Sequence, residues 1–175
     1  LAAAAPVVGT NGDNYLQGWS GGNTNLQGMG GNDTLSGWIG NDILDGGTGN
    51  DYLSGQEGDD VYLFNRGDGQ DTISEYSATR NLDAIRLGAG ITASDIACAH
   101  NGFDLILNIK GTTDQLKILN WKKGYNYRIE RVEFADGTVW DAAFLEAMPY
   151  MGTNGNDTLH GDDGNNTLIG LSGND

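Results

Sequence analysis

GGTGNDYLS, residues 46–54, follows the pattern G-G-x-G-x-D-x-U-x, in which U is a large apolar residue. Six consecutive segments between Gly9 and Leu63 share this nine-residue period, and one extra residue, Gly18, interrupts it. Three residues of each repeat suit a short strand whose central side chain points inward, and six form a turn that glycine permits. The inward residues occupy position eight of the repeat, at Leu16, Leu26, Leu35, Leu44, Leu53 and Tyr62. The pattern predicts a coil of very short parallel strands.

Position six of the repeat is acidic in the later copies, and it reads Asn14, Thr24, Asp33, Asp42, Asp51 and Asp60. Burying one leucine per repeat contributes about 2 kcal/mol, whereas fixing nine backbone residues costs on the order of 9 to 18 kcal/mol. Aspartates stacked from turn to turn also repel one another. Carboxylates and turn carbonyls together supply the roughly six to eight oxygen ligands that Ca²⁺ prefers, whereas Mg²⁺ demands a tighter octahedron. We therefore expect several Ca²⁺ ions between the turns.

These repeats resemble the RTX repeats of proteins exported by bacterial type I secretion, such as the adenylate cyclase toxin and haemolysin family. The resemblance covers residues 9–75 and resumes at Gly152. It implies a parallel β-roll with calcium between turns on the same side, and hence between repeats that are two apart. Asp33 is then expected to face Asp51, and Asp42 to face Asp60.

The same resemblance identifies the site residues. Sites that Asn14 and Thr24 would share are expected to be weaker or empty, because these residues depart from the pattern. Asp68 and Asp71, in the tract that closes the array, are expected to hold the last ion. The metal-site residues implied are Asn14, Gly31, Asp33, Gly40, Asp42, Gly49, Asp51, Gly58, Asp60, Asp68, Asp71 and Asp157.

Two simpler interpretations compete with calcium binding. The aspartates could be Asx-turn formers in a solvated surface, although turn formation alone does not require a nine-residue register. The chain could also be disordered, since 29 glycines and a net charge of −15 are typical of a chain without a core. We expect disorder without calcium and a folded chain with it.

Composition excludes several classes of protein. A pI of about 4.1 argues against nucleic acid and anionic membranes as partners, and no apolar run approaches the roughly 18 residues of a spanning helix. Cys98 is the only cysteine, so no internal disulfide is expected. Residues 1–8 lack a basic region and an initial Met, which favours the end of a preceding module or linker over a targeting signal.

Residues 76–148 differ from the repeats, because glycine becomes rarer and apolar residues alternate. Residues 103–109, 115–119 and 128–134 are predicted to be antiparallel strands, with turns at 111–114 and 136–137. Asp141 is expected to cap a short helix over 142–148 that Pro149 ends. The segment resembles the flanking region of RTX toxins and is assigned the role of covering the open end of the roll. Trp121 and Trp140 are expected in the core.

A longer repeat is also visible, since residues 145–155 echo residues 2–12 at an offset of 143 residues. We infer that modules of this kind occur in tandem, and that residues 149–175 begin a second RTX block. The chain divides into a linker, a roll, a capping segment and a second roll, at residues 1–8, 9–75, 76–148 and 149–175. Because the second block stops within a repeat, end-to-end self-association through its last strand is a further expectation.

Catalytic constellations are not expected. His100 and His160 are interpreted as solvated surface residues, since they fall in a predicted loop and at a repeat's ninth position. Asp59 and Asp60 are neighbours in a turn and do not form a glycosidase pair, which spans roughly 5 to 9 Å across a cleft. No G-x-S-x-G elbow is present. Trp19 and Trp38 lie in repeat turns and are candidates for a contact surface.

Three functions follow from these observations. The leading one is a calcium-binding module of a secreted or cell-surface bacterial protein that is disordered without calcium and folds on extracellular calcium after export. Its partners are calcium, the type I secretion machinery and neighbouring RTX blocks. The alternative is a calcium-rigidified module of an adhesin that binds carbohydrate or another surface; ice binding is disfavoured, because only Thr48 with Asn50 gives the Thr and Asn pair. An enzyme has no supporting constellation.

Overall fold

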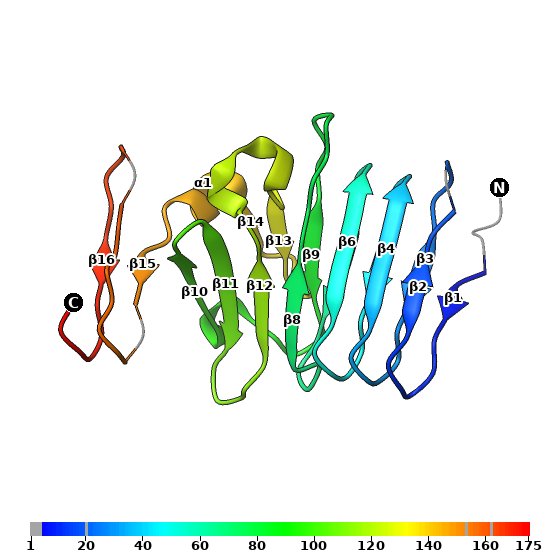
Figure 1. Cartoon of the computed structure of the whole chain (residues 1–175), viewed down its shortest axis with the longest axis horizontal. Coiled ribbons are helices and arrows are strands. Elements are labelled where there is room, and N and C mark those ends of the chain that lie inside the picture. The colour runs from blue at the N-terminus through cyan, green and yellow to red at the C-terminus, as the bar shows by residue number, and fades with distance from the viewer. Residues whose placement is uncertain (1–4, 20, 153, 162) are drawn as a thin grey trace.

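The computed structural model describes residues 5–19, 21–152, 154–161 and 163–175. Short strands lie side by side along the long axis of the molecule and form two sheets with a common core (Figure 1). One sheet has seven strands, in the order β1-β3-β5-β7-β9-β13-β14. The other has nine, in the order β16-β15-β10-β11-β12-β8-β6-β4-β2. The predicted all-β class is confirmed.

The repeats form a parallel β-roll, in which successive strands alternate between the two sheets. Each strand pairs in parallel with the strand two places along the chain, as β3 pairs with β5 and β4 pairs with β6. The strands are β1 (Val7–Val8), β2 (Tyr15–Gln17), β3 (Asn25–Gln27), β4 (Thr34–Ile39), β5 (Ile43–Asp45), β6 (Tyr52–Glu57), β7 (Val61–Phe64) and β8 (Gln70–Ile73). Two consecutive repeats therefore make one coil of the roll.

Position eight of the repeat builds the core. Leu26, Leu44 and Tyr62 are in register on one sheet, and Leu35 and Leu53 are in register on the other. All five side chains are fully buried. The side-chain period of two along a strand explains why one apolar residue per three-residue strand is enough to line the interior.

The capping segment, residues 76–148, continues both sheets. Strands β10, β11 and β12 pair antiparallel, as do β13 and β14. The contacts with the roll are parallel, since β12 pairs with β8 and β9 pairs with β7, and β13 then pairs in parallel with β9. The ladder of buried apolar residues therefore passes without a break from the roll into this segment. Its strands are β9 (Ala84–Leu87), β10 (Ile96–Asn101), β11 (Asp104–Ile109), β12 (Gln115–Ile118), β13 (Arg131–Glu133) and β14 (Val139–Asp141), with 3₁₀ turns at Ala93–Asp95, Trp121–Lys123 and Tyr125–Tyr127.

Strands β11 and β12 lie where the alternation predicted them, whereas β13 is shorter than the strand predicted over residues 128–134. The residues before β13 hydrogen-bond outside the sheet. Trp121 Nε1 donates to the carbonyl of Ile129 over 2.9 Å, and the Glu130 amide donates to the carbonyl of Asp83 over 3.2 Å. These bonds anchor the fully buried Trp121, which is a core residue as predicted.

Helix α1 spans Ala142–Glu146, two residues shorter than predicted. Asp141 is its N-cap, because Oδ1 accepts from the Phe144 amide over 2.8 Å. Trp140, just before the cap, is buried and its ring packs against Phe134 and Phe144. The helix thus closes over the last strands of the seven-stranded sheet.

The interpretation of His100 as a solvated loop residue is wrong. His100 lies in β10, is fully buried, and continues the inward-facing row of Leu105. Its Nε2 bonds the carbonyl of Leu145 over 2.9 Å, and its ring packs against Trp121 and Tyr150. Burial lowers its pKa, and the nearby Lys122 lowers it further. The burial of His100 could not be predicted from the sequence, because apolar and polar residues alternate only weakly in β10. His160 is exposed, as expected.

The second array adds β15 (Tyr150–Met151) and β16 (Leu168–Ile169) to the nine-stranded sheet. Strand β15 pairs in parallel with β10, and the His100 amide donates to the Pro149 carbonyl over 2.7 Å. No helix within the described ranges is long and apolar enough to cross a membrane.

Candidate metal centre

The turns of the roll form two rows, named here by the residue at position six. Row A contains Asn14, Asp33, Asp51 and Asp71, and follows the lower edge of the roll in Figure 1. Row B contains Thr24, Asp42, Asp60 and Asp83, and follows the upper edge.

Hydrogen bonds join neighbouring turns along row A. The amide of each position-six residue donates to Oδ1 of the aspartate in the next turn. The distances are 2.7 Å from Asn14 to Asp33, 2.7 Å from Asp33 to Asp51 and 2.9 Å from Asp51 to Asp71. The structure therefore brings Asp33 beside Asp51, as the resemblance to RTX repeats implied.

Row B has the same ladder. Thr24 donates to Asp42 over 2.6 Å, Asp42 to Asp60 over 2.7 Å and Asp60 to Asp83 over 2.8 Å. The Asp83 amide then donates to Glu130 Oε2 over 2.9 Å, so a residue of the capping segment completes the row. Asp42 and Asp60 lie together, as predicted.

Two aspartates in each ladder leave one carboxylate oxygen unused. The Oδ2 atoms of four aspartates are buried without a hydrogen-bond partner, namely those of Asp33, Asp42, Asp51 and Asp60. A buried, unpartnered carboxylate oxygen is strongly unfavourable. These atoms therefore indicate a cation between the turns.

The glycines at position one leave room for such an ion. A Cβ on Gly28 would clash with both Asp33 Oδ2 and the carbonyl oxygen of Gly46 in the next turn. Neither oxygen is a donor, so the two atoms converge as ligands of a cation would. Within the described ranges, no three His, Cys, Asp or Glu side chains form a metal site by themselves, so backbone carbonyls must contribute. An oxygen set of this kind fits the hard cation Ca²⁺.

The glycines at position four are required by backbone geometry. Gly31, Gly40, Gly49 and Gly58 have φ of 99°, 131°, 144° and 131°, a region that L-residues rarely adopt. A Cβ on Gly58 would also clash with the carbonyl oxygen of Gly40 in the preceding turn. The absence of a side chain at position four therefore lets the backbone carbonyls of neighbouring turns stack closely along each row.

Burial raises the pKa of the row aspartates. The pKa of Asp60 rises to about 7, that of Asp71 to about 8 and that of Asp83 to about 9, with neighbouring carboxylates adding to the effect of burial. Burial also raises the pKa of Asp33, Asp42 and Asp51. Such groups resist ionisation together unless a positive charge lies between them.

Three other predicted site residues take part in the turns in different ways. Asp68 shares the last row A turn with Asp71, but its Oδ2 accepts from the amide and from Nδ2 of Asn65, over 2.6 and 3.0 Å. Asn14 contributes its amide to the ladder, while its Nδ2 donates to Thr10 Oγ1 over 3.2 Å. In the second array, the Asp157 amide donates to Asp175 Oδ1 over 3.1 Å.

Sequence reasoning missed four acidic residues at the end of the roll. Asp83 and Glu130 extend row B, and Asp114 Oδ2 accepts from the Gly67 amide over 2.9 Å beside row A. Glu75 is buried and bonds the Tyr62 hydroxyl and the Gln56 amide. Of these, only Asp83 carried a signal, because Asp83, Ala84 and Ile85 repeat the D-x-U element after an irregular interval.

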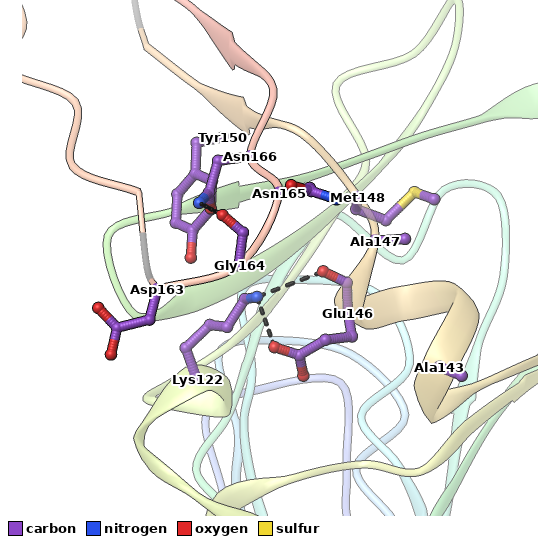
Figure 2. Close-up of a pocket in the computed structure, with 10 residues that line it drawn as sticks. All are labelled: Lys122, Ala143, Glu146, Ala147, Met148, Tyr150, Asp163, Gly164, Asn165 and Asn166. Carbon is purple, nitrogen blue, oxygen red and sulfur yellow. Dashed lines mark hydrogen bonds and ion pairs between the residues drawn. The ribbon is translucent and has the colours of Figure 1, made fainter.

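The largest cavity described lies away from both rows. It has a volume of about 510 Å³ and lies between α1 and the second array (Figure 2). Lys122 projects into it and bonds the carboxylate and the carbonyl of Glu146, over 2.6 and 3.3 Å. This arrangement is an ion pair at the joint between the capping segment and the second array, and it offers no oxygen cage for calcium.

A roll with two acidic rows of glycine-rich turns defines a calcium-binding repeat protein, and comparison with known families agrees. The model of the RTX calcium-binding nonapeptide repeat matches residues 20–53, 39–73 and 151–175. The model of the haemolysin-type calcium binding protein related domain matches residues 104–143. The predicted resemblance is confirmed: the chain carries RTX repeats, which bind Ca²⁺ at several sites, together with a haemolysin-related segment.

Two individual proteins are similar to this chain. The iron-regulated protein FrpA of Neisseria meningitidis serogroup C is 35% identical over 104 residues, which cover 57% of this chain and 9% of FrpA. The AlgE6R3 subunit of the Azotobacter vinelandii mannuronan C5-epimerase matches with a TM-score of 0.50 and 24% identity, over 93% of this chain and 99% of the subunit. The second likeness supports the fold alone.

Proposed function

We propose that this chain is a calcium-dependent folding module of a secreted bacterial protein. Without calcium the chain is disordered, and with extracellular calcium it folds into the β-roll described above. The main support for this proposal is the set of four buried aspartate Oδ2 atoms that have no hydrogen-bond partner. A fold that buries these oxygens in ionised carboxylates is destabilised unless a cation binds them.

The proposed ligands follow the rows. Carboxylates come from position six and carbonyl oxygens from the glycine turns. We call the space between two neighbouring turns of a row a gap. Asp68 and Asp71 are proposed ligands in the last gap of row A, and Asp157 is a proposed ligand in the second array. The proposed set is that expected from the sequence: Asn14, Gly31, Asp33, Gly40, Asp42, Gly49, Asp51, Gly58, Asp60, Asp68, Asp71 and Asp157. When bound, Ca²⁺ supplies positive charge and nothing else; the chain's own oxygens position it.

Several sites acting together make folding a switch. Extracellular calcium modules work at dissociation constants of about 0.1 to 1 mM, and a 100-fold excess of ligand stabilises a fold by about 2.7 kcal/mol per site. A chain held unfolded at low calcium suits passage through the type I exporter. We propose this machinery and neighbouring RTX blocks as its partners, with residues 9–75 as the roll, 76–148 as its cap, and no catalytic role.

The test is a calcium titration of the chain followed by far-ultraviolet circular dichroism, with Mg²⁺ as the control ion. A cooperative gain of β signal with Ca²⁺ alone is expected. Asp51→Asn is expected to raise the calcium midpoint, whereas Asp136→Asn, at an exposed turn, leaves it unchanged. A chain that is fully folded in chelator would refute the proposal.

A carbohydrate-binding role is a second candidate, and one observation favours it. Trp19 and Trp38 are 74% and 42% exposed on the row B side, and Trp38 adopts a φ of 78°. Met29 and Gln56, at the same repeat position, have similar φ values, so the angle belongs to the repeat; the exposure of two large aromatic side chains, a residue type enriched at interfaces, favours the proposal. Binding of a glycan array by the calcium-loaded chain, lost in a Trp19→Ala and Trp38→Ala double variant, would support it; equal binding by both would exclude it.

A further inference from the structure

The last gap of row B is closed by an amide. Asn81 is 8% exposed, and its Nδ2 donates to the carbonyl of Gly58 and to Asp83 Oδ2, both over 2.9 Å. The Gly58 carbonyl is an acceptor only, so in the absence of a metal the NH₂ end of the Asn81 amide must face it. Asn81 thus joins a position-four carbonyl to a position-six carboxylate.

Asn81 stands where each regular repeat has a glycine. Leu82 and Asp83 bond Asp59 and Asp60 of the preceding turn, as positions five and six do throughout the row. This places Asn81 at position four, opposite Gly58. The regular repeats supply no side chain at position four, and their aspartates keep an unpartnered Oδ2. Asp83, whose Oδ2 is bonded to Asn81, is not among them.

Two repeats that lack an aspartate at position six place a side-chain donor at the position-four carbonyl of their own turn. Thr24 Oγ1 donates to the carbonyl of Gly22 over 3.3 Å, and Asn166 Nδ2 donates to the carbonyl of Gly164 over 2.7 Å. In each case a side-chain donor bonds the position-four carbonyl. Such a donor supplies partial positive charge at a carbonyl that a cation would otherwise bind.

We propose that the Asn81 amide takes the place of a calcium ion in the last gap of row B, and so sets the number of ions that the roll binds. This inference rests on the proposed function and specifies which gaps bind ions. It also divides the molecule by calcium dependence. At the joint between roll and cap, hydrogen bonds of Asn81, Asp83 and Glu130 connect the turns without calcium. The regular gaps require calcium to neutralise their carboxylates.

The experiment counts bound Ca²⁺ per chain by equilibrium dialysis of the full chain. Asn81→Asp replaces the donor by a carboxylate, and one additional ion is expected. Thr24→Asp is a second variant on the same row and is also expected to add one ion. Asn32→Asp is the matched control: it makes the same charge change at an exposed position-five residue whose Oδ1 accepts from the Asn50 amide, and the count stays at the wild-type value.

Asn81→Ala separates the proposal from its main rival. If Asn81 is a spacer that excludes calcium, the alanine variant frees the Gly58 carbonyl and Asp83 Oδ2 and binds at least as many ions as the wild type. If Asn81 is itself a ligand through Oδ1, the variant binds one ion fewer, and the proposal is overturned. An unchanged count in both Asn81→Asp and Thr24→Asp also overturns it.

Hydrogen exchange gives an independent measurement. At calcium concentrations below saturation, where the roll is only partly ordered, the Leu82 and Ala84 amides, which bond Asp59 Oδ1 and the Asp60 carbonyl, are expected to exchange more slowly than the Asp33 amide. Equal exchange at all three would contradict the calcium-independent joint. A wild-type chain that binds no calcium would refute the proposed function, whereas calcium binding with unchanged variant counts would refute only this inference.

Discussion

The amide of Asp60 donates to Oδ1 of Asp83 over 2.8 Å, although 23 residues separate the two positions. Within the regular array the same bond joins residues 18 apart, as between Asp42 and Asp60. The rung geometry therefore persists after the nine-residue period has ended. The extra residues form a loop that Glu57 holds by accepting from the Ala78 amide and the Thr79 hydroxyl.

Gly46→Ala is expected to weaken calcium binding at least tenfold and to destabilise the calcium-loaded fold by about 1–3 kcal/mol. A Cβ at this position clashes with Asp51 Oδ2, the oxygen proposed to face the ion. Calorimetric titration and urea unfolding measure both effects. Gly22→Ala is the control, since nothing lies within 4 Å of its Cβ position, and an equal loss in both variants would contradict this reasoning.

In chelator, acidification is expected to favour the folded state. The folded-state pKa values of Asp60, Asp71 and Asp83 are about 7, 8 and 9, above the unfolded value of about 3.9. The folded chain therefore binds more protons, and its stability rises as the pH falls from about 9 through 7. Circular dichroism between pH 9 and pH 5 tests this.

With calcium the trend reverses, because protons compete with the ion for the same carboxylates. The calcium midpoint is expected to rise as the pH falls. A β signal in chelator that decreases between pH 9 and pH 5 would show that the row carboxylates do not control folding.

Acidification has the opposite effect in the capping segment. Burial lowers the pKa of His100 in the folded state, so its contribution to stability is lost as the pH falls through the unfolded value of about 6.5. His100→Gln keeps a donor for the Leu145 carbonyl and removes the titration. At saturating calcium, urea unfolding at pH 7.5 and 5.5 is expected to show a larger acid loss in the wild type than in the variant.

Met29→Gly is expected to stabilise the roll by up to about 1 kcal/mol. Met29 is 51% exposed and has a φ of 81°, at a repeat position where Gly47 has 88°. Relief of the left-handed strain, about 1–2 kcal/mol, exceeds the entropic cost of glycine, about 0.5–1 kcal/mol. Met29→Ala keeps the Cβ and is expected to give no gain in urea unfolding; a gain of equal size would assign the effect to the side chain.

The roll was predictable because its period fixes each residue's place. A three-residue strand with Leu44 or Leu53 at its centre has one inward position, and the six-residue turn then places the aspartates in rows. The pairing of Asp33 with Asp51 was implied by the resemblance to RTX repeats, and the structure confirms it. The conversion of that pairing into calcium sites depends on Oδ2 atoms and carbonyls that only the folded structure brings together.

The end of the roll was less predictable, because contacts between distant segments decide it. Asp114 and Glu130 reach the rows from the capping segment, and no periodic pattern links them to Gly67 or Asp83. His100 is similar: its burial follows from pairing with Leu105 and Tyr150 on neighbouring strands. A short strand with weak alternation does not reveal which face it buries.

The side-by-side stacking of the coils has a mechanical consequence. Hydrogen bonds run along the stack, so tension that pulls the N-terminal coil away from the cap breaks the bonds of one coil before loading the next. Each coil contains 18 residues, which extend to about 60 Å when released. Under force, the roll would lengthen in uniform steps, as an extensible tether whose step length is set by the repeat.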